Sequence, residues 1–551
     1  MRVRIASTLL AVSLATVVTV ASMPAAQAAA ATATATVLRL ELPGPVPEGQ
    51  DVRVRATLMD PAAVAVEGAT VVLLQGRPDD AVVDAVVATG TTDAAGTVRL
   101  IAPPDRRRPF VSYYARFEGD ADRAASVSTT GRVRMAGVTA ATTTSLAAPS
   151  RATLGRPITV RASVSGIEQG DPRGVVRLER LTSSGWLALR DATIDGRGVA
   201  SIGVTMVERS TRLRARYLGT DGYTASSSAD VTVSAAPQTT TLTLTAPRKI
   251  VDERTLRVSA RLRTPHGAVA GSRVEFQARR GGTWRTYRTA RTNGAGVARA
   301  TSTPRRTYRY RAVFRSASYY AASTSTSRRV ENLPPAKVVR LPRKAPRPVR
   351  LPAQARATGA GARATISPVG SSVWRSMTGR SWRAGCPVGR DQLRVVRVNY
   401  WGFDGYRHRG ELVVHRAIAG RTARAFTDLY RHRVPIRAMY RVDRFGYSAR
   451  VRGADDYRSM AADNTSAFNC RNVVGRPGVR SPHAYGRAID LNPFENPFRS
   501  GTDGWVPNSW WRTRSAGTYA WTKASHLVPR IMRRHGFRWT YGTADGHHFD
   551  G

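Results

Sequence analysis

The sequence predicts a multidomain protein in which three antiparallel β-sandwiches precede one α+β domain. Three observations support this fold class. The 551 residues exceed what one hydrophobic core normally supports. Residues 33–331 repeat one Thr- and Val-rich pattern with a period of about 100 residues, which indicates repeated units of one fold. The repeat ends at residue 331, and after residue 366 Trp, Tyr, His and Phe become more frequent.

The first 28 residues are expected to form a secretory signal peptide. A basic head, "MRVR", precedes an apolar stretch over 5–21, and "AQA" at 26–28 offers small residues for cleavage. An uncleaved membrane anchor is the alternative interpretation. No later segment approaches the roughly 20 apolar residues of a spanning helix. We therefore expect a secreted, extracellular protein without a transmembrane segment after cleavage.

The charge balance is strongly basic. The chain has 85 Lys and Arg against 38 Asp and Glu, a net charge of +47. Such a field attracts polyanions, including nucleic acid, acidic lipid and anionic cell-wall polymers. Because export removes the protein from intracellular nucleic acid, we expect no nucleic-acid partner and favour anionic cell-wall polymers.

The three repeats occupy residues 33–136, 137–235 and 236–331. Alternating runs such as "ITVRASVSG" (158–166) and "LRVSARLRT" (256–264) predict strands, and turn signals recur between them. This pattern is typical of β-sandwiches, and the repeats resemble the immunoglobulin-like repeats of bacterial surface and secreted proteins. We expect them to act as a spacer or an adhesive stalk.

Aromatic residues align between the repeats. Phe117, Tyr217 and Phe314 share one position, and Trp186 matches Trp284 in the second and third copies. We expect these aligned aromatics to be core residues.

Residues 332–366 form a Pro- and Arg-rich segment between the repeats and the last domain. Acidic residues are absent from 333–365. Proline favours extended backbone and like charges repel, so this segment is expected to be a stretched, solvated linker that can also contact an anionic polymer.

The last domain spans residues 367–551. Helical periodicity appears over 416–433 and 524–537, and strand-like runs cover 393–403 and 435–442. This mixture predicts one α+β domain with its own core.

Both cysteines, Cys386 and Cys470, fall in this domain. In an oxidising compartment such a pair is most simply a disulfide, with two buried free thiols as the alternative. Neither belongs to a CxxC motif, so cysteine-ligated zinc is not predicted.

Two stretches of the last domain combine histidine with aspartate. In "SPHAYGRAIDLNP" (481–493), a turn at Gly486 followed by a short strand would bring His483 and Asp490 toward one point. "TADGHHFDG" (543–551) adds an aspartate and two adjacent histidines. Two imidazoles and a carboxylate suit Zn²⁺, with a fourth position left for a water whose pKa the metal lowers to about 7.

The second stretch leaves one choice open. Simple strand alternation places Asp545 and His547 on one face and favours His547 as the metal ligand. A carboxylate that does not bind the metal can accept the proton of the activated water, and Asp545 is placed for that role.

These motifs resemble the M15 zinc metallopeptidases. The family includes VanY-type D-alanyl-D-alanine carboxypeptidases and L-alanyl-D-glutamate endopeptidases, and the similarity covers about residues 390–551. It rests on "NTSAFNCR" (464–471), "SPHAYGRAIDLNPFENP" (481–497) and "DGHHFD" (545–550). Every fixed position of the family pattern S-x-H-x-x-G-x-A-x-D is present, namely Ser481, His483, Gly486, Ala488 and Asp490.

The resemblance implies a DD-peptidase-like α+β fold and one zinc ion per catalytic domain. The family spacing favours His548, rather than His547, as the third ligand beside His483 and Asp490. It also implies that Asp545 is the general base and later the proton donor. Arg471 would polarise the scissile carbonyl, and Ser481 would support the substrate or the ligands.

The sequence therefore predicts a secreted zinc peptidase that hydrolyses peptide bonds in peptidoglycan stem peptides. D,D-carboxypeptidase and L-Ala-D-Glu-type endopeptidase activity both fit, on the organism's own wall or a foreign one. A non-catalytic wall-binding or adhesive protein that retains the peptidase fold is the alternative. The expected partners are peptidoglycan and anionic wall polymers, and the expected oligomeric state is a monomer.

Overall fold

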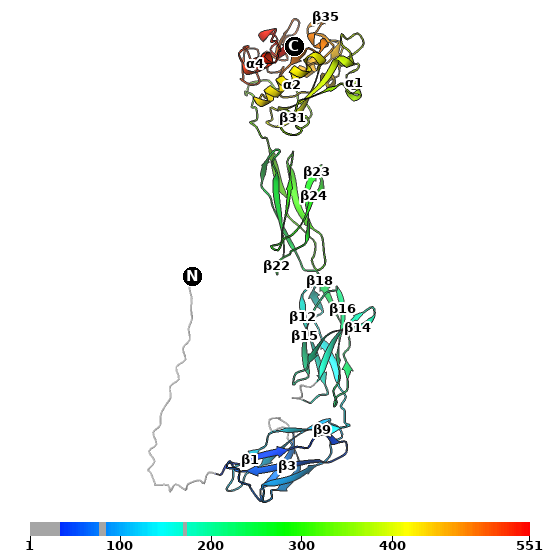
Figure 1. Cartoon of the computed structure of the whole chain (residues 1–551), viewed down its shortest axis with the longest axis vertical. Helices are drawn as coiled ribbons and strands as arrows, with labels where there is room; N and C mark the ends of the chain where they lie inside the picture. Colours follow the sequence, from blue (N-terminus) through cyan, green and yellow to red (C-terminus); the bar gives the residue numbers. More distant parts are fainter. Residues whose placement is uncertain (1–32, 77–83, 169–173) are drawn as a thin grey trace, which may run out of the picture. The chain divides into compact units, whose positions relative to one another are not determined.

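The computed structural model describes residues 33–76, 84–168 and 174–551 (Figure 1). The expected signal peptide, 1–28, lies outside the described residues. Within the described part of the chain, no helix is long and apolar enough to cross a membrane. The chain forms two compact units, Met1–Pro237 and Gln238–Gly551.

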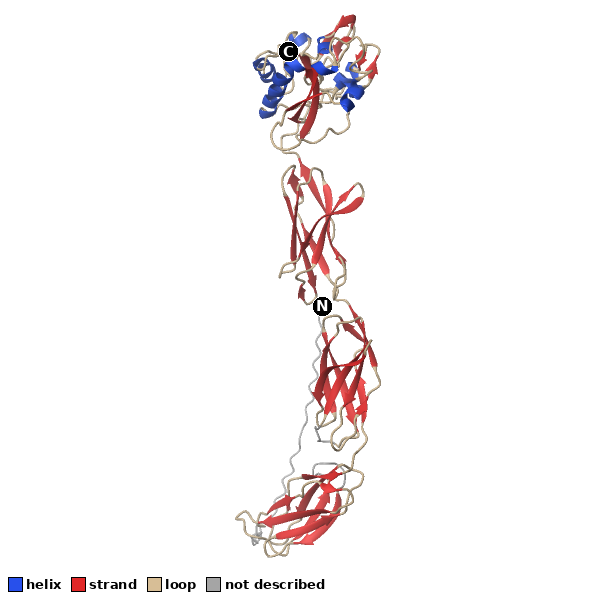
Figure 2. Cartoon of the chain, turned by 45° about the vertical axis from the view of Figure 1, so that its right-hand side comes forward, coloured by secondary structure: helices blue, strands red, loops and turns tan. Residues whose placement is uncertain are grey.

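The first unit contains two sandwiches, each built from a three-stranded and a six-stranded sheet (Figure 2). In the first sandwich the smaller sheet has the order β1 (Val37–Glu41), β3 (Val52–Met59), β6 (Thr97–Ala102). The larger sheet has the order β2 (Val46–Pro47), β9 (Gly131–Ala136), β7 (Phe110–Phe117), β4 (Thr70–Gln75), β5 (Ala85–Thr91), with β8 (Ser126–Val127) beside β7. Buried Val, Leu and Ala residues from both sheets form its core.

The second sandwich repeats this topology. Its smaller sheet has the order β10 (Thr143–Ala147), β12 (Pro157–Ser165), β15 (Val199–Thr205). Its larger sheet has the order β11 (Arg151–Thr153), β18 (Val231–Ala236), β16 (Ser210–Tyr217), β13 (Val175–Thr182), β14 (Gly185–Thr193), with β17 (Ser226–Ser227) beside β16.

The second unit begins with a third sandwich of the same topology. One sheet joins β19 (Thr241–Thr245), β21 (Leu256–Thr264) and β22 (Gly267–Ala268), with β25 (Val297–Ser302) also paired to β21. The other has the order β20 (Lys249–Val251), β28 (Arg328–Leu333), β26 (Tyr308–Phe314), β23 (Arg273–Arg280), β24 (Thr283–Arg291), with β27 (Ser323–Thr324) beside β26. The repeated strand order agrees with the sequence repeat, because copies of one pattern fold in the same way.

The aligned aromatics divide into two groups. Phe117, Tyr217 and Phe314 are buried, as expected for core residues. Trp186 and Trp284 are only partly buried and lie under arginine side chains, so the prediction that they belong to the core is wrong. An indole shielded by a guanidinium can remain at the surface, because the cation covers the ring face.

The segment before the last domain is extended and largely exposed, but it is attached to that domain at several points. The backbone amides of Val339 and Val349 donate to Phe403 and Ala461. Ala345 packs into a small apolar cluster with Trp511. The expectation of a purely solvated linker is therefore wrong, because its backbone groups and its small residues find partners on the domain surface.

The last domain is built around a three-stranded sheet of β29 (Thr365–Pro368), β30 (Leu393–Trp401) and β31 (Arg407–His415). Its α-helices are α1 (Ser371–Met377), α2 (Arg416–Arg431), α3 (Asp456–Ala461) and α4 (Leu527–Arg534), and its 3-10 turns are η1 (Arg390–Gln392), η2 (Val442–Phe445), η3 (Pro482–Tyr485) and η4 (Gly542–Ala544). Apolar side chains of α2, α4, β30 and β31 form the main core. The opposite side chains of β30 and β31 pack with α1 and Cys470 in a second cluster.

Four short antiparallel strand pairs surround this centre: β32 (Tyr447–Ser448) with β33 (Gly453–Ala454), β34 (Asn472–Val473) with β35 (Arg476–Arg480), β36 (Ala488–Asp490) with β39 (His548–Asp550), and β37 (Phe498–Ser500) with β38 (Gly504–Val506).

The elements predicted in this domain are largely present. The helices expected over 416–433 and 524–537 correspond to α2 and α4, and the run 393–403 corresponds to β30. The run 435–442 is not a strand, because it makes only isolated bridges at Pro435 and Ala438. Its apolar side chains fill the core from an irregular segment instead.

Candidate metal centre

Three side chains from separate parts of the last domain meet at one point. His483, Asp490 and His548 each offer one potential ligand atom, and these atoms lie within 4.8 Å of one another. All three side chains are buried. This is the residue set that the sequence and the family spacing predicted.

His483 is positioned by the turn η3. The hydroxyl of Ser481 caps this turn by accepting a hydrogen bond from the His483 amide at 3.3 Å. The turn ends at Gly486, whose φ of 66° is left-handed. A Cβ there would stand 2.8 Å from the amide nitrogen of His415, so glycine is required for two reasons. The predicted turn at Gly486 is thus confirmed.

The other two residues face each other across a strand pair. β36 and β39 are antiparallel, and their register places Asp490 directly opposite His548. A direct cross-strand pair brings Cβ atoms to about 5 Å, close enough for both side chains to reach a shared ion. Because β39 begins at His548, the alternation argument for His547 does not apply to the preceding turn.

In His483 and His548, one ring nitrogen contacts a neighbouring oxygen atom, and the other nitrogen points toward the other candidate ligands. His483 donates from Nδ1 to the carbonyl of Ala467 at 2.6 Å, which leaves Nε2 as the lone-pair atom. His548 places Nε2 3.0 Å from the carboxylate of Asp550, which leaves Nδ1 inward. The two inward nitrogens are 3.1 Å apart.

This arrangement fits a cation. In the neutral tautomers two lone pairs would face each other at 3.1 Å, with Oδ1 of Asp490 3.1 Å from His483 Nε2 and 3.3 Å from His548 Nδ1. Three electron-rich atoms this close repel unless a positive charge lies between them. Two imidazoles and a carboxylate are a ligand set that zinc accepts, and the outer partners of the rings orient them as in metal sites.

The electrostatics favour an ionised Asp490 with a positive charge beside it. Burial alone would raise the pKa of Asp490, but the nearby rings of His483 and His547 hold it well below its ordinary range. Burial favours the neutral form of His548, yet hydrogen bonds to Asp490 and Asp550 raise its pKa to about 10.

Asp545 and His547 lie beside the three candidate ligands. Nε2 of His547 is 3.3 Å from Oδ1 of Asp545 and 3.8 Å from Oδ1 of Asp490, while its Nδ1 is 2.7 Å from the carbonyl oxygen of Asn496. Burial raises the pKa of Asp545. The Asp545 side chain nevertheless keeps 15% of its surface exposed, so it can exchange protons with a substrate.

Arg471 is held by a carboxylate from α3. Its guanidinium is 2.7 Å from Oδ2 of Asp456, and it donates to the carbonyl of Asn472 at 3.0 Å. Both side chains of the Arg471–Asp456 pair are nearly inaccessible, so the guanidinium is fixed in place.

A cavity of about 670 Å³ opens beside the three candidate ligands. Every site residue predicted from the sequence contributes to its wall: the candidate ligands, Asp545, Arg471 and Ser481. Three further arginines also line it, Arg476 and Arg480 from the hairpin β34–β35 and Arg499 from β37. In the described part of the domain, no carboxylate forms an ion pair with any of these three.

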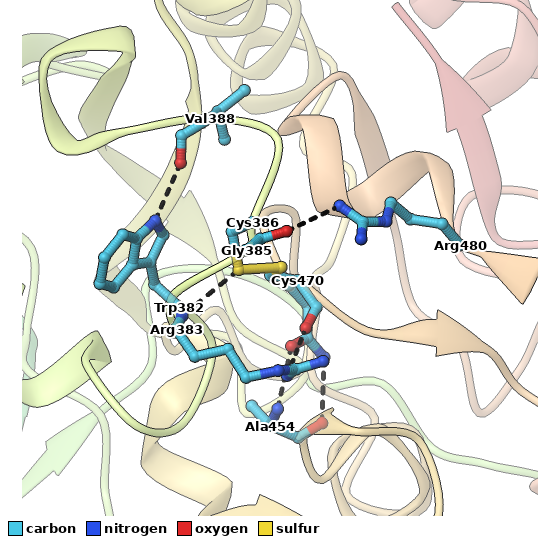
Figure 3. Close-up of a disulfide and its surroundings, with 9 residues drawn as sticks. Trp382, Arg383, Gly385, Cys386, Val388, Ala454, Cys470 and Arg480 are labelled. Carbon is cyan, nitrogen blue, oxygen red and sulfur yellow. Dashed lines mark hydrogen bonds between the residues drawn. A yellow bond between two sulfur atoms is a disulfide. The ribbon is translucent and has the colours of Figure 1, made fainter. Parts of the chain in front are cut away.

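The predicted disulfide is present (Figure 3), and Cys470 directly precedes Arg471, which lines the cavity. Cys386 and Cys470 are joined, with their Cα atoms 6.0 Å apart. The amide of Cys470 donates to Ser381 and its carbonyl accepts from Arg383, both at 2.9 Å. The residue after Cys470 is Arg471, so these contacts fix the backbone that carries the guanidinium.

Sequence reasoning missed Asp456 and Asp550. Asp550 stands two residues after His548 on one strand, so strand alternation could have placed both on one face. Asp456 carries no such signal, because it meets Arg471 only through the packing of α3.

Two family comparisons match parts of the chain. Residues 474–551 match the family described as D-alanyl-D-alanine carboxypeptidase, of the M15 peptidases, and residues 143–236 match the bacterial Ig-like domain (group 3). No curated protein matches the chain.

Similar solved structures relate to parts of the chain. A tetra-tandem repeat in the extending region of a large adhesion protein is 13% identical, with 70% of this chain and 89% of that chain covered and a TM-score of 0.26. Escherichia coli alpha-2-macroglobulin activated by porcine elastase is 14% identical, with 55% and 34% covered and a TM-score of 0.17.

The strand topology agrees with the Ig-like family match, and the grouped histidines and aspartate agree with the peptidase family match. The chain carries a D-alanyl-D-alanine carboxypeptidase domain of the M15 kind at its C-terminus, preceded by a bacterial Ig-like domain.

Proposed function

We propose that this protein is a secreted zinc-dependent peptidase that hydrolyses peptide bonds in peptidoglycan stem peptides. One observation carries the proposal: the inward nitrogens of His483 and His548 meet Oδ1 of Asp490 at 3.1–3.3 Å beside an open cavity. The family match to residues 474–551 supports the same reaction class.

The cavity residues have complementary roles in peptide hydrolysis. His483, Asp490 and His548 would hold zinc, which would lower the pKa of a bound water molecule to about 7. Asp545 accepts the proton of the attacking water and delivers it to the leaving amine, a role suited to a buried carboxyl with a raised pKa. Arg471, fixed by Asp456, stabilises the negative charge that develops on the carbonyl oxygen.

The arginines in the cavity wall suit an acidic peptide. Arg476, Arg480 and Arg499 line the cavity without ion-pair partners among the described residues. Guanidinium groups bind carboxylates through paired hydrogen bonds, and stem peptides carry free carboxylates. A net charge of +47 would also hold the enzyme near anionic wall polymers.

Two measurements on purified wall peptides test the proposal. Chelation with EDTA should abolish hydrolysis and Zn²⁺ should restore it. Asp545→Asn should lower the rate by about 10²–10⁴-fold, the usual contribution of a general base, while the variant still binds one zinc per chain. Asp391→Asn, at an exposed acid in η1, is the matched control and should retain full activity.

The outcomes separate the candidate functions. Unchanged hydrolysis by Asp545→Asn would remove the mechanism. Stoichiometric zinc without turnover on any stem peptide would instead support a non-catalytic wall-binding protein with the peptidase fold. Mass spectrometry of digested muropeptides distinguishes D,D-carboxypeptidase from endopeptidase cleavage, because the two release different fragments.

A further inference from the structure

Three arginines form a row across the larger sheet of the third sandwich. The strand register pairs Arg279 of β23 with Arg309 of β26, and Arg309 with Arg329 of β28. Directly paired residues share one face of a sheet, and neighbouring strands are about 4.8 Å apart. The three guanidinium groups therefore project from one exposed face along a line that crosses the strands.

The positive charges of this row are not neutralised within the described residues. Arg279 donates to the carbonyl of Gly282 at 3.0 Å, which is an uncharged acceptor. In the described part of the chain, none of the three arginines forms an ion pair with a carboxylate. Like charges directly opposite each other destabilise a strand pair. The row therefore lowers the stability of the sheet, and folding does not require arginine at these exposed positions.

The row ends at a basic hollow. A depression of about 400 Å³ is lined by Arg329 together with Arg248, Lys249 and Arg328. Among the described residues that line it, Glu331 is the one acid. The positive surface therefore continues from the strands of the sheet into a concave site.

The second sandwich has the same topology without this row. Arg214 stacks on Trp186 there, as Arg311 stacks on Trp284 in the third sandwich, and these stacks align the two copies. The positions that correspond to Arg279, Arg309 and Arg329 are Leu181, Arg212 and Thr232. Arg212 is paired with Asp230. The row is therefore a feature of the third sandwich and not of the repeated fold.

We propose that the outer face of the third sandwich, from Arg279 through Arg309 and Arg329 to the hollow at Arg248 and Lys249, binds a linear anionic polymer with phosphodiester charges. A chain that crosses the strands meets one guanidinium per strand, about every 4.8 Å. Guanidinium groups bind phosphate oxygens in a bidentate manner, so three successive phosphates can be held at once.

A polyol-phosphate chain fits this face better than nucleic acid does. Proteins that bind single-stranded nucleic acid combine basic grooves with aromatic rings on which bases stack. The aromatic residue paired with the row is Trp284, and Arg311 covers its ring at 4.4 Å from the centroid. The face therefore offers charge without a free stacking platform.

Fluorescence anisotropy of a labelled glycerol-phosphate oligomer with the full-length protein tests the proposal. The triple variant Arg279→Gln, Arg309→Gln, Arg329→Gln should bind at least about tenfold more weakly at 0.1 M salt. The slope of log affinity against log salt should fall in magnitude by about 2, because fewer counterions are exchanged. Substitution of the same three positions by Lys keeps the charge but removes the paired hydrogen bonds, so it should recover only part of the affinity that the Gln variant loses.

The matched control removes three arginines from the other sheet of the same sandwich. Arg257, Arg261 and Arg263 of β21 are exposed and follow one another along a single strand. No arginine is paired directly opposite any of them on the neighbouring strands, so they form no row across the sheet. Their replacement by Gln changes the net charge equally and should weaken binding less than twofold. Equal losses in both Gln variants would show that only the diffuse charge attracts the polymer, and would overturn the proposal.

Two further outcomes are decisive. Removing mutually repelling charges should leave the thermal midpoint of the row variant equal to or above that of the wild type. A single-stranded DNA oligonucleotide of equal charge that bound as tightly as the glycerol-phosphate oligomer would contradict the assigned chemistry. None of these readouts depends on hydrolysis, so they stand apart from the test of the peptidase.

Discussion

At the scale of single residues, the orientation of His548 depends on a carboxylate on the same strand. Asp550 lies 3.0 Å from Nε2, which directs Nδ1 toward His483 and Asp490. Such outer partners fix the tautomer and raise the basicity of a ligating ring. Asp550 is therefore as much part of the candidate centre as the ring that it holds.

Replacing Asp550 by Asn should weaken zinc binding by about 10–100-fold, the usual effect of losing a carboxylate behind a metal-binding histidine. Competition with a chromophoric chelator measures this affinity without reference to turnover. Asp391→Asn, an exposed surface change, should leave the affinity unchanged. Equal zinc affinity in the Asp550 variant and the wild type would mean that the ring is oriented by its packing alone.

A second residue-scale effect concerns a buried carboxyl pair near the motif. Arg437 contacts both Asp463 and Glu495 at 2.9 Å, so one cation serves two inaccessible acids. Burial and the neighbouring Asp463 raise the pKa of Glu495 well above its ordinary value. The stability that protonated Glu495 contributes is fully present below the pKa that this residue has in the unfolded chain. It is lost as the pH rises through the higher pKa that the residue has in the folded protein.

Glu495→Gln, which is never charged, should therefore lose less stability than the wild type when the pH is raised from about 5 to 8. Urea unfolding midpoints at the two pH values measure the difference. Glu411→Gln is the control: Arg397 outweighs the burial of Glu411 and lowers its pKa, so Glu411 is ionised in both the folded and the unfolded chain above about pH 5, and this variant should follow the pH profile of the wild type from pH 5 to 8. Parallel pH profiles for the wild type and the Glu495 variant would contradict this assignment.

At the scale of elements, the disulfide fixes the segment that carries Arg471. Cys386 and Cys470 are 84 positions apart, and the bridge joins the loop after α1 to the strand-like segment before β34. A closed loop of this length stabilises a fold mainly by restricting the unfolded chain.

The double variant Cys386→Ser, Cys470→Ser should lose about 4 kcal/mol of stability in the chain-entropy model. Hydrolysis should fall at temperatures well below the unfolding transition, because Arg471 loses its anchored neighbour. Denaturant unfolding and steady-state rates at the same temperature measure the two effects. A stable protein with full activity would show that Asp456 alone holds the guanidinium.

At the scale of the whole molecule, charge is the dominant property. A net charge of +47 creates a field that attracts any anionic wall polymer before a specific contact forms. Screening shortens this field to about 10 Å at 0.1 M salt and to about 3 Å at 1 M.

Retention of the full-length protein on purified wall material should therefore decrease steeply between 0.1 and 1 M NaCl. Sedimentation of the wall with bound protein measures this retention. Wall stripped of anionic polymers is the matched control and should retain less protein at low salt. Retention that is independent of salt would indicate an uncharged wall component as the ligand.

The sequence by itself determined the repeats, the disulfide pair and the candidate ligands. Each copy of the 100-residue repeat has a turn residue and a buried aromatic residue. This local pattern was enough to predict three domains with the same fold. The motif around His483 and Asp490 is also local, because Gly486 enforces the turn between them. The choice of His548 over His547 came from the family resemblance, since strand alternation pointed to His547, which is not in the group of three possible ligands.

Only the tertiary structure decided which charges meet. The Arg471–Asp456 pair, the facing lone pairs of His483 and His548, and the row from Arg279 to Arg329 all join residues distant in the chain. Strand register and helix packing set these distances, and neither follows from the period of side chains along one segment. For the same reason Trp186 and Trp284 resembled core residues in the sequence, although the fold leaves them at the surface under arginines.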